Sequence, residues 1–340
     1  MRRIVFARHG GPEVLELRES PDPEPAPGEV RVRVEAAGVN FADILGRMGL
    51  YPDAPPLPAV VGFETAGRID AVGRGVSEDL VGLPVIALGG SGGYTDVLCV
   101  PEERVFARPT GMSAEEGAAM PVVYLTAYVA LCVMGSLVPD QRVLVHNAGG
   151  GVGLAALDIC RLKGATSYGT ASSWKHETLR ERGAAACIDY RSVDFEPEIE
   201  RITAGEGVDL VLDPLGGDSW KKSYRCLRPT GRLVIFGMSR MVRGKSSGKL
   251  DALRTLFRVP WFALNPLRLL RDSRGIVGVN LQQIRENAED ARRWMSELLG
   301  WYEAGRLAPR IDRVFPLGEA ADAHRYIQER QNLGKVLLAP

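Results

Sequence analysis

The sequence predicts an α/β protein in which a doubly wound parallel sheet is inserted into a β-rich domain. The chain has 340 residues, too many for one small core, because a domain usually takes about 100–200 residues. Up to about residue 110, short apolar runs alternate with Gly and Pro, which is typical of strands and turns. From about Val143 the apolar runs are separated by helical patterns, which indicates a parallel sheet covered on both faces by helices.

The β-rich part begins at the N-terminus. Its segment 20–29 contains five Pro or Gly residues in ten, which predicts a surface turn entering a strand. The predicted strands have the sequences RIVFA, VLELRE, EVRVRVEAAGV, GRIDAVG, LPVIALGG and TDVLCV.

Residues 117–139 carry no charged side chain, and these 23 positions are enough to cross a bilayer. Pro121, Tyr124 and Thr126 lie within them and suit a helix buried in a protein core. We therefore expect a buried helix here rather than a membrane span.

Five β-then-α units follow, and GIVGVNL (275–281) predicts a sixth strand. The tail returns to the features of the first part, with a helix around 288–303, the strand RIDRVFPL, the helix GEAADAHRYIQER and the strand GKVLLAP. We therefore expect a discontinuous substrate domain, formed by residues 1–120 plus 300–340, around a nucleotide-binding domain formed by residues 121–299.

The strongest local pattern is LVHNAGGGVGLAALDICRLKGA, in which an apolar strand meets a glycine cluster and passes into an amphipathic helix. Ala148, Gly150 and Gly153 have the spacing of G-x-G-x-x-G, with Ala148 at the first glycine. Small residues let the backbone approach a pyrophosphate, and the N-terminus of the helix offers free N–H groups to it. This pattern predicts dinucleotide binding.

The end of the next strand indicates which dinucleotide binds. An NAD-preferring protein places Asp or Glu there, about 20 residues after the turn, to accept from the ribose 2′-hydroxyl. Here the strand TSYGTA runs into Ala171, Ser172, Ser173, Trp174 and Lys175. Small hydroxyls followed by a cation favour the 2′-phosphate of NADPH, although Lys175 alone also fits a solvated helix position.

The composition excludes other classes of partner. The chain has 42 basic and 42 acidic residues, so no overall field attracts nucleic acid, and we expect a small-molecule partner. Its five cysteines are odd in number and never form C-x-x-C, which argues against a disulfide framework and a tetrahedral zinc cluster. The N-terminal residues lack a signal-peptide pattern, so we expect a cytoplasmic protein.

Together these residues resemble the medium-chain dehydrogenase/reductase superfamily, and within it the zinc-free quinone oxidoreductases. The resemblance implies a Rossmann domain inserted into a GroES-like substrate domain. Within this group, the chain is most similar to the vesicle amine transport protein branch. The segments that carry it are AAGVNFADILGRMGLYP, PAVVGFETAGRIDAVG, GGYTDVLCVP, AAMPVVYLTAY, VLVHNAGGGVG, GVDLVLDPLGG, RYIQERQNLGKVLL, GTASSWKHETL and DPLGGDSWKKSY.

The chain departs from the zinc-dependent members of that superfamily at their metal ligands. By motif alignment, those positions hold Asn40, Phe63, and Val122 or Val123. An amide, a phenyl ring and an isopropyl group cannot hold zinc, which takes thiolate, imidazole or carboxylate ligands. The structural zinc lobe is also missing, because residues 82–109 contain one cysteine. We expect no metal.

Reduction of a quinone or an enone does not need that metal. Hydride goes to an electrophilic carbon while negative charge develops on the distant carbonyl oxygen, where hydrogen-bond donors stabilise it. The resemblance implies Asn40, Tyr51 and Tyr124 as catalytic candidates. Alternatively, Asn40 braces a loop or contacts cofactor, Tyr51 packs on the following prolines, and Tyr124 is a core aromatic.

Two nearby polar residues suit structural roles. Asp43 is expected to order the NFAD turn rather than to transfer protons. His146 lies on the apolar strand before the glycine turn, where a satisfied core histidine is favoured over a catalytic base. For the cofactor, the resemblance implies a separate set of residues: Thr126, Gly150, Gly151, Val152, Gly153, Ser172, Lys175, Tyr190, Phe236, Gly237, Met238 and Asn332.

Residues 238–274 are rich in Lys, Arg and large apolar side chains. Three alternatives fit this segment, in decreasing order of preference: a lid over an active site, a dimer interface and a membrane contact. The strand at 275–281 favours a homodimer through pairing of sheet edges. A zinc-independent NADPH-dependent quinone or enone reductase is the leading hypothesis, and the alternative is a low-turnover NADPH-binding regulatory or membrane-associated protein.

Overall fold

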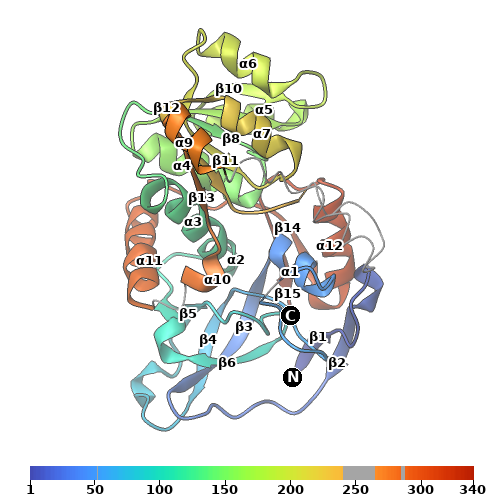
Figure 1. The fold of residues 1–340 in the computed structure, drawn as a ribbon. Coiled ribbons are helices and arrows are strands. Elements are labelled where there is room, and N and C mark those ends of the chain that lie inside the picture. Colours follow the sequence, from blue (N-terminus) through green and yellow to red (C-terminus); the bar gives the residue numbers. More distant parts are fainter. Residues whose placement is uncertain (52, 240–264, 285–287) are drawn as a thin grey trace. The chain divides into compact units, whose positions relative to one another are not determined.

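The computed structural model describes residues 1–51, 53–239, 265–284 and 288–340. The chain forms two compact units (Figure 1). Unit 1 takes the described residues of Met1–Val122 and Gln282–Pro340, and unit 2 takes those from Val123 to Leu281. The predicted boundary at 120/121 is within two residues of this division. The predicted boundary at 299/300 instead falls inside a helix that belongs to unit 1 throughout its length.

Unit 1 is the β-rich unit, and its main sheet has the strand order β14-β15-β3-β4-β5-β7, with β6 also paired to β3. A separate two-stranded sheet joins β1 to β2. The strands are β1 (Arg2–Val5), β2 (Glu16–Glu19), β3 (Glu29–Val39), β4 (Thr65–Val72), β5 (Pro84–Ala87), β6 (Val97–Pro101), β7 (Val105–Ala107), β14 (Ile311–Pro316) and β15 (Lys335–Ala339). Every strand predicted from the sequence of this part is present.

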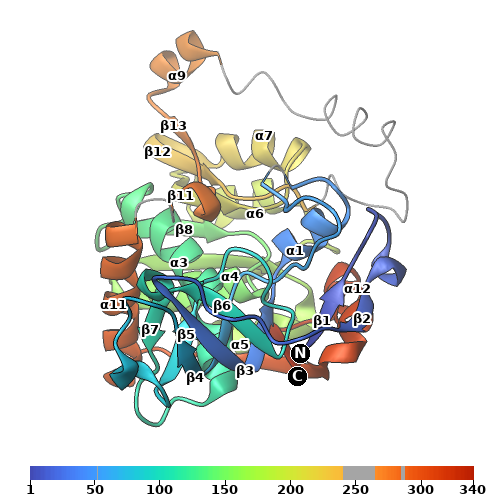
Figure 2. The ribbon, with the colours of Figure 1, turned by 90° about the horizontal axis from the view of Figure 1, so that it is seen from below.

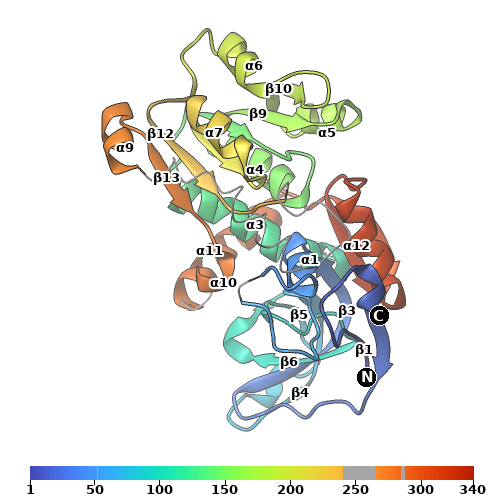
Figure 3. The same cartoon turned by 45° about the vertical axis from the view of Figure 1, so that its right-hand side comes forward.

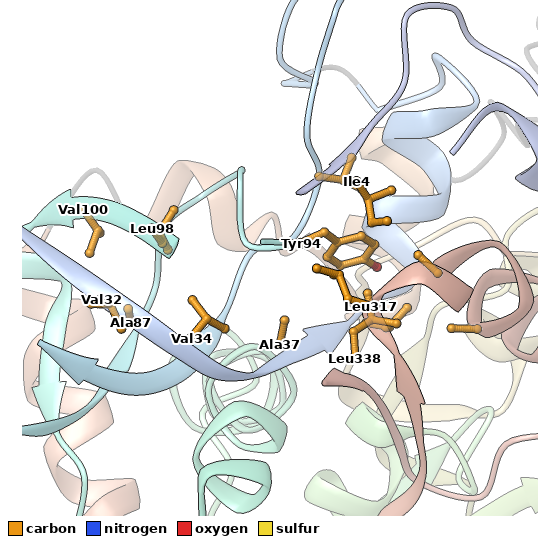
Figure 4. Packing of buried hydrophobic residues seen from close by; sticks show 14 of the residues in the cluster. Ile4, Val32, Val34, Ala37, Ala87, Tyr94, Leu98, Val100, Leu317 and Leu338 are labelled. Carbon is orange, nitrogen blue, oxygen red and sulfur yellow. The ribbon is translucent and has the colours of Figure 1, made fainter. Parts of the chain in front are cut away.

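The alternation in β3 shows why this sheet forms. Val30, Val32 and Val34 are buried, while Arg31 and Arg33 between them point outward, because successive side chains face opposite sides of a strand. Figure 4 shows the inward side chains of β3 packed in one core with apolar residues of other strands. The C-terminal β15 completes this sheet by pairing antiparallel with β3.

The described helices of unit 1 come from both of the sequence segments that form it. The first of them, α1, follows directly after β3, so the chain turns out of the sheet at residue 40. They are α1 (Phe41–Arg47), α2 (Ala114–Ala119), α10 (Leu281–Ile284), which starts at the boundary of the units, α11 (Ala288–Glu303) and α12 (Ala320–Gln328).

Unit 2 is built on a six-stranded sheet with the order β10-β9-β8-β11-β12-β13, and every neighbouring pair is parallel. Its strands are β8 (Arg142–Val145), β9 (Thr166–Ala171), β10 (Ala184–Asp189), β11 (Val208–Asp213), β12 (Leu227–Ile235) and β13 (Gly275–Gly278). In chain order this is the 3-2-1-4-5-6 arrangement of the dinucleotide-binding fold. The predicted doubly wound sheet and its sixth strand are confirmed, and Figure 2 shows β13 beside β12.

The helices found among the described residues of unit 2 lie between these strands in the sequence, except α3, which precedes β8. They are α3 (Pro121–Tyr128), which starts at the unit boundary, α4 (Gly151–Leu162), α5 (His176–Glu181), α6 (Phe195–Ile202), α7 (Asp218–Arg225) and α9 (Pro266–Asp272). Leu144 and Tyr168 share a core cluster with Phe195 of α6 and Trp220 of α7. Gly169, the next residue of β9 after Tyr168, faces the other side of the sheet, where a Cβ would meet Leu179 of α5. Helix α5 therefore covers the opposite face.

The uncharged stretch 117–139 contains the end of α2, then α3, and then a π-helical turn at Val129–Val133. Most of its residues are buried, as expected. Across the described ranges, we find no helix with the length and apolar character needed to span a membrane. Residues 240–264 of the basic segment 238–274 lie outside the described residues.

Candidate active site

The carboxyl ends of the parallel strands in unit 2 carry most of the residues predicted to bind cofactor. In a doubly wound sheet, ligands bind at this edge, where the strand order reverses. In unit 2 the reversal falls between β8 and its neighbours β9 and β11. The chain leaves β8 through the predicted glycine turn and enters α4 at Gly151, with Gly150 as the N-cap.

The glycine turn is packed too closely for side chains. A Cβ atom added to Gly153 would lie 2.4 Å from the Asn147 carbonyl oxygen and 2.5 Å from Ala148 Cα. A Cβ added to Gly150 would lie 2.8 Å from Asn147 Nδ2. Small residues are therefore required to bring the start of α4 against β8, and this leaves backbone N–H groups at the first turn of α4.

The ends of β9 and β10 bring three more predicted residues together. The Ser172 hydroxyl donates to the Tyr190 hydroxyl over 3.4 Å, and Ser172 is buried. Lys175 lies in the short 3-10 turn after β9, is 5% exposed, and has its ammonium 4.8 Å from the ring centroid of Trp174. Ser172, Lys175 and Tyr190 thus place hydroxyl groups and one cation at the same edge as the glycine turn.

A carboxylate at the end of β10, next to Tyr190 in the sequence, already has partners. Asp189 Oδ1 accepts from the Arg191 N–H over 3.0 Å. Hydrogen bonds from this N–H and from Ser173 hold the pKa of Asp189 below its ordinary value. Asp189 therefore serves the turn after β10, and no acidic residue occurs between Thr166 and Lys175.

The end of β12 supplies Phe236, Gly237 and Met238, all half-buried. A Cβ on Gly237 would lie 3.1 Å from the Pro214 carbonyl oxygen, so the chain after β12 passes close to the turn that follows β11. These three residues share the strand-end edge with the glycine turn, whereas Asn332 lies in unit 1 and donates its amide to the Gly334 carbonyl over 2.9 Å.

His146 is buried beneath the glycine turn with both ring nitrogens occupied. Nδ1 lies 3.0 Å from the Thr170 hydroxyl, and Nε2 lies 3.0 Å from the Ser223 hydroxyl. Ser223 in turn donates to Asp213 over 2.7 Å. The prediction of a satisfied core histidine is confirmed, and this chain of contacts ties β8, β9 and β11 to α7.

Tyr124 and Thr126 lie on α3 and are both buried. The Tyr124 hydroxyl donates to Asp158 Oδ2 over 2.7 Å, and Arg182 pairs with the same carboxylate over 2.5 Å. Burial raises the pKa of Tyr124 well above its ordinary value, and the neighbouring Asp158 carboxylate adds to this rise. The hydroxyl of Tyr124 thus anchors α3 to α4, and a catalytic role for it stays a prediction.

In unit 1, Asn40 lies between the end of β3 and the start of α1 and is 8% exposed. Its amide Nδ2 donates to Glu64 Oε1 over 2.8 Å, and its Oδ1 accepts from Lys335 Nζ over 2.6 Å. Lys335 and Glu64 form an ion pair of 2.5 Å, and both side chains are buried. The three side chains therefore form one closed hydrogen-bonded ring, which we call the Asn40 ring.

The Asn40 ring includes one of the positions that the motif alignment assigns to the zinc ligands of the zinc-dependent members. Glu64 Oε2 accepts from the Val122 N–H over 2.7 Å, so Glu64 joins the first ligand position to one of the two candidates, Val122 and Val123, for the third. Phe63, at the histidine position, precedes Glu64 and meets the Tyr51 ring edge-on at a centroid distance of 5.7 Å. The structure thus brings these positions together, but with an amide, a phenyl ring and a valine, which do not fit zinc.

The described part of the chain contains no cluster of three His, Cys, Asp or Glu side chains suited to a metal ion. Tyr51, a predicted catalytic residue, is half-buried beside Phe63. Tyr51 contacts Phe63, and Phe63 is followed in the sequence by Glu64 of the Asn40 ring, so Tyr51 lies near the ring.

Asp43 orders the turn that follows Asn40, as expected. Its carboxylate accepts from the N–H groups of Asn40 and Gly62, each over 2.8 Å, and from the Tyr94 hydroxyl over 3.1 Å. Burial raises the pKa of Asp43 to about 7, although the backbone N–H groups oppose that rise. Asp43 therefore fixes the backbone of the residue whose side chain belongs to the ring.

A buried chain of hydrogen bonds continues from Tyr94 to α12, which lies beside α1 (Figure 3). Arg47 can only donate, so His324 Nδ1 accepts from Arg47 over 3.2 Å, and His324 Nε2 carries the hydrogen toward Tyr94, 3.0 Å away. Burial lowers the pKa of His324 well below its ordinary value. The imidazole is therefore neutral and joins α12 to α1.

Glu64 and Lys335 are the functional candidates that the sequence did not single out. Both lie inside segments that carry the family resemblance, GFETAG and GKVLL. Their separation of 271 residues gives no local pattern. Glycine at position 38 makes room for this carboxylate, because a Cβ there would lie 2.5 Å from Glu64 Oε1.

Comparison with known proteins agrees with this architecture. The family model described as alcohol dehydrogenase GroES-like domain matches residues 26–110, and the one described as zinc-binding dehydrogenase matches residues 182–338. The chain belongs to the medium-chain dehydrogenase/reductase superfamily, in its quinone oxidoreductase group with the VAT-1 homologues. It is therefore a member of an oxidoreductase family.

Particular relatives are similar over the whole chain. The synaptic vesicle membrane protein VAT-1 homolog of Rattus norvegicus is 42% identical, over 100% of this chain and 84% of that protein. The quinone oxidoreductase of Pseudomonas aeruginosa is 35% identical, over 100% of this chain and 99% of that protein. The crystal structure of Escherichia coli quinone oxidoreductase complexed with NADPH has a TM-score of 0.87 and 31% identity, and each chain is covered completely.

Proposed function

We propose that this chain is an NADPH-dependent reductase that transfers hydride to a quinone or an α,β-unsaturated carbonyl compound, without zinc. The observation that carries the proposal is the set of Ser172, Lys175 and Tyr190 at the sheet edge beside the glycine turn. A cation and hydroxyl groups there suit a 2′-phosphate, and the NADPH complex of the Escherichia coli relative supports the same cofactor.

Unit 2 has the features that NADPH requires. The turn from Gly150 through Gly151 and Val152 to Gly153 would hold the pyrophosphate, because its close packing leaves N–H groups and the positive end of α4 at the strand edge. Thr126 and the residues 236–238 are the other members in this unit, and the proposed set also includes Asn332 of unit 1. When bound, NADPH supplies a hydride.

The residues of unit 1 provide for the electrophile. Negative charge develops on its carbonyl oxygen during hydride transfer, and an aligned N–H or O–H donor lowers the barrier by about 3–4 kcal/mol. Asn40 is the proposed donor, because one Nδ2 hydrogen remains after its bond to Glu64. Tyr51, half-buried beside Phe63, is a second donor or a positioning aromatic.

Zinc has no place in this scheme. One matched family model is described as a zinc-binding dehydrogenase. The ligand positions here hold Asn40, Phe63, and Val122 or Val123, and the Asn40 amide is engaged with Glu64 and Lys335. Removal of a proton from an alcohol needs an activating group such as zinc, whereas an enone or quinone needs only donors for its oxygen.

Lys175→Ala tests the cofactor assignment. Loss of the ammonium should weaken NADPH binding about 10–100-fold, because a hydrogen bond to a charged group is worth about 1.5–3 kcal/mol, while NADH binding should change little. Fluorescence titration of both dinucleotides measures this, with Lys221→Ala on α7 as the matched control. Equal losses for NADPH and NADH would contradict the 2′-phosphate assignment.

Gly151→Val tests the glycine turn. A branched side chain at the first residue of α4 should prevent a pyrophosphate from approaching the N–H groups and abolish NADPH binding. Thermal unfolding should stay close to that of the wild type, because Gly151 is half-buried at the helix start. Binding of NADPH with unchanged affinity would remove the turn from the proposed site.

A panel of quinones and enones tests the reaction. We expect NADPH oxidation that depends on the electrophile and survives treatment with a metal chelator. If NADPH binds tightly and no electrophile is reduced, the alternative of a low-turnover NADPH-binding regulatory or membrane-associated protein replaces this proposal. Co-sedimentation with anionic liposomes, with and without residues 238–274, then tests membrane contact.

A homodimer through β13 remains part of the proposal. Within the described ranges, β13 is the last strand of its sheet and pairs on one side with β12. An open strand edge can pair with its own copy about a two-fold axis. Sedimentation equilibrium should give twice the chain mass, and a purely monomeric species at micromolar concentration would exclude this arrangement.

A further inference from the structure

We propose that Glu64 and Lys335 are positioning residues that hold the Asn40 carboxamide in one orientation, with one Nδ2 hydrogen directed to the oxygen of the electrophile. This inference deepens the proposed function and rests on it for the identity of the electrophile. It concerns three side chains that lie within unit 1.

The orientation of the amide is fixed by the chemistry of its two partners. The Lys335 ammonium only donates, so the atom 2.6 Å from it is the amide oxygen. The Glu64 carboxylate only accepts, so the atom 2.8 Å from it is the amide nitrogen. A reversed amide would place donor against donor and acceptor against acceptor, and both contacts would be lost.

The closed ring determines which hydrogen is left. Lys335 and Glu64 are 2.5 Å apart, so they contact the same edge of the amide, and the Nδ2 hydrogen on the side of Oδ1 is used by Glu64. The other hydrogen points away from this edge. The Lys335 ammonium also polarises the carbonyl of the amide, which makes the remaining N–H a stronger donor.

Glu64 and Lys335 are bound to Asn40 and to each other, and this leaves the Asn40 amide as their link to a substrate. Glu64 is fully buried and the Lys335 side chain is 3% exposed, whereas Asn40 is 8% exposed. Glu64 Oε1 accepts from Asn40 and from Lys335, and Glu64 Oε2 accepts from the Val122 N–H, so both oxygens of the carboxylate are already engaged within the protein. Their effect on the reaction must therefore pass through the amide that they contact.

The surroundings hold the pair in place. Lys335 is the first residue of β15, and its neighbour Val336 pairs with Val39, the residue before Asn40. Glu64 Oε2 is held by the Val122 N–H over 2.7 Å. Two paired strands thus deliver the ammonium to the amide, and a backbone donor fixes the carboxylate.

A double-mutant cycle tests the inference. The pair variant is Glu64→Gln with Lys335→Met, which removes both charges together and leaves no isolated buried ion. Asn40→Ala removes the donor, and the triple variant combines all changes. We expect Asn40→Ala to lower kcat by about 100-fold or more, as for loss of one oxyanion donor, and the pair variant to lower kcat about tenfold or more with little change in KM.

The decisive comparison is the effect of the pair variant in the Asn40→Ala background. If Glu64 and Lys335 act through Asn40, the pair variant lowers kcat no further there. An equal loss in both backgrounds shows an independent or general structural effect and overturns the inference. Wild-type kcat in the pair variant also overturns it. Thermal unfolding and NADPH titration identify any variant that has lost its fold.

A second measurement does not depend on turnover. In protein labelled with ¹⁵N-asparagine, the Asn40 amide signals are those that disappear in Asn40→Ala. We expect two protons with widely separated shifts in the wild type, because Glu64 binds one of them, and a smaller separation in the pair variant. Nearly equal shifts in the wild type would overturn the fixed orientation, whereas absence of activity with every electrophile would overturn only the proposed function.

Discussion

The polar centres of the two units are built in opposite ways. In unit 1 the Asn40 ring consists of buried side chains that satisfy one another, with Lys335 and Glu64 2.5 Å apart. In unit 2 the glycine turn has almost no side chains. A Cβ added to Gly153 would lie 2.5 Å from Ala148 Cα. Unit 1 should therefore be sensitive to the removal of side-chain groups, and unit 2 to their addition.

Gly153→Ala should have the largest effect. The added Cβ would meet the Asn147 carbonyl and the Ala148 backbone, which cannot move like the end of a flexible side chain. We expect a loss of about 3 kcal/mol in the free energy of unfolding, together with weaker NADPH binding. Urea unfolding followed by circular dichroism measures the change.

The matched control is Gly300→Ala on α11, where an added Cβ has no neighbour within 4 Å. It should be neutral or stabilise the protein by about 1 kcal/mol, because alanine favours the helix. If Gly153→Ala were as well tolerated as Gly300→Ala, the close packing of the turn would not be a constraint.

Asp43→Asn should have an intermediate effect that depends on pH. Burial raises the pKa of Asp43 to about 7 in the folded protein, against about 4 in the unfolded chain. Between these values the folded state binds more protons, so this carboxyl makes the free energy of unfolding fall as pH rises from about 4 to 7. Asn lacks this dependence.

The cost of Asp43→Asn should therefore be about 1–3 kcal/mol near pH 5, because buried hydrogen bonds are lost, and it should shrink toward pH 7.5. Urea unfolding of both proteins across this range checks the trend. A cost that grew with pH would mean that the folded state keeps Asp43 ionised and would reverse the assignment.

Asp70→Asn should have the smallest effect and sharpens the contrast with the buried pair. Asp70 pairs with Arg31 over 2.8 Å and with Arg33 over 2.5 Å, but it lies on the outward face of β4 and is partly exposed. Solvent and salt screen such pairs, so we expect less than about 1 kcal/mol and a smaller value in high salt. A loss of several kcal/mol would place this surface network among the main determinants of stability.

Local sequence patterns were enough to predict the glycine turn and the strands of both units except β7 (Val105–Ala107). The turn RVLVHNAGGGVG is encoded by adjacent residues, and its strand-to-helix transition at Gly151 appears as predicted. The amphipathic pattern of α11 predicted a helix, but such a pattern does not say which unit covers its apolar face. The predicted boundary at 299/300 therefore cut through a helix of unit 1.

The contacts within the candidate site were less accessible to sequence reasoning. Tyr124 was predicted as a catalytic candidate, and nothing near it in the sequence indicates that Asp158, 34 residues away, accepts from its hydroxyl. The Lys335–Asn40 contact joins residues 295 positions apart. Periodicity reports which face of an element is buried, but it does not identify the partner of a buried polar group.

The position of Lys335 has a consequence for protein synthesis. A chain grows from its N-terminus, and domains tend to fold as they emerge. All six strands of the unit 2 sheet precede β14 and β15, so this sheet can form while unit 1 still lacks the strand that pairs with β3. Until then Asn40 lacks the contact with Lys335, which is translated 295 residues later. Nascent chains released before that point would have the complete sheet of unit 2, but the sheet of unit 1 would lack β15, and the Asn40 ring would lack Lys335.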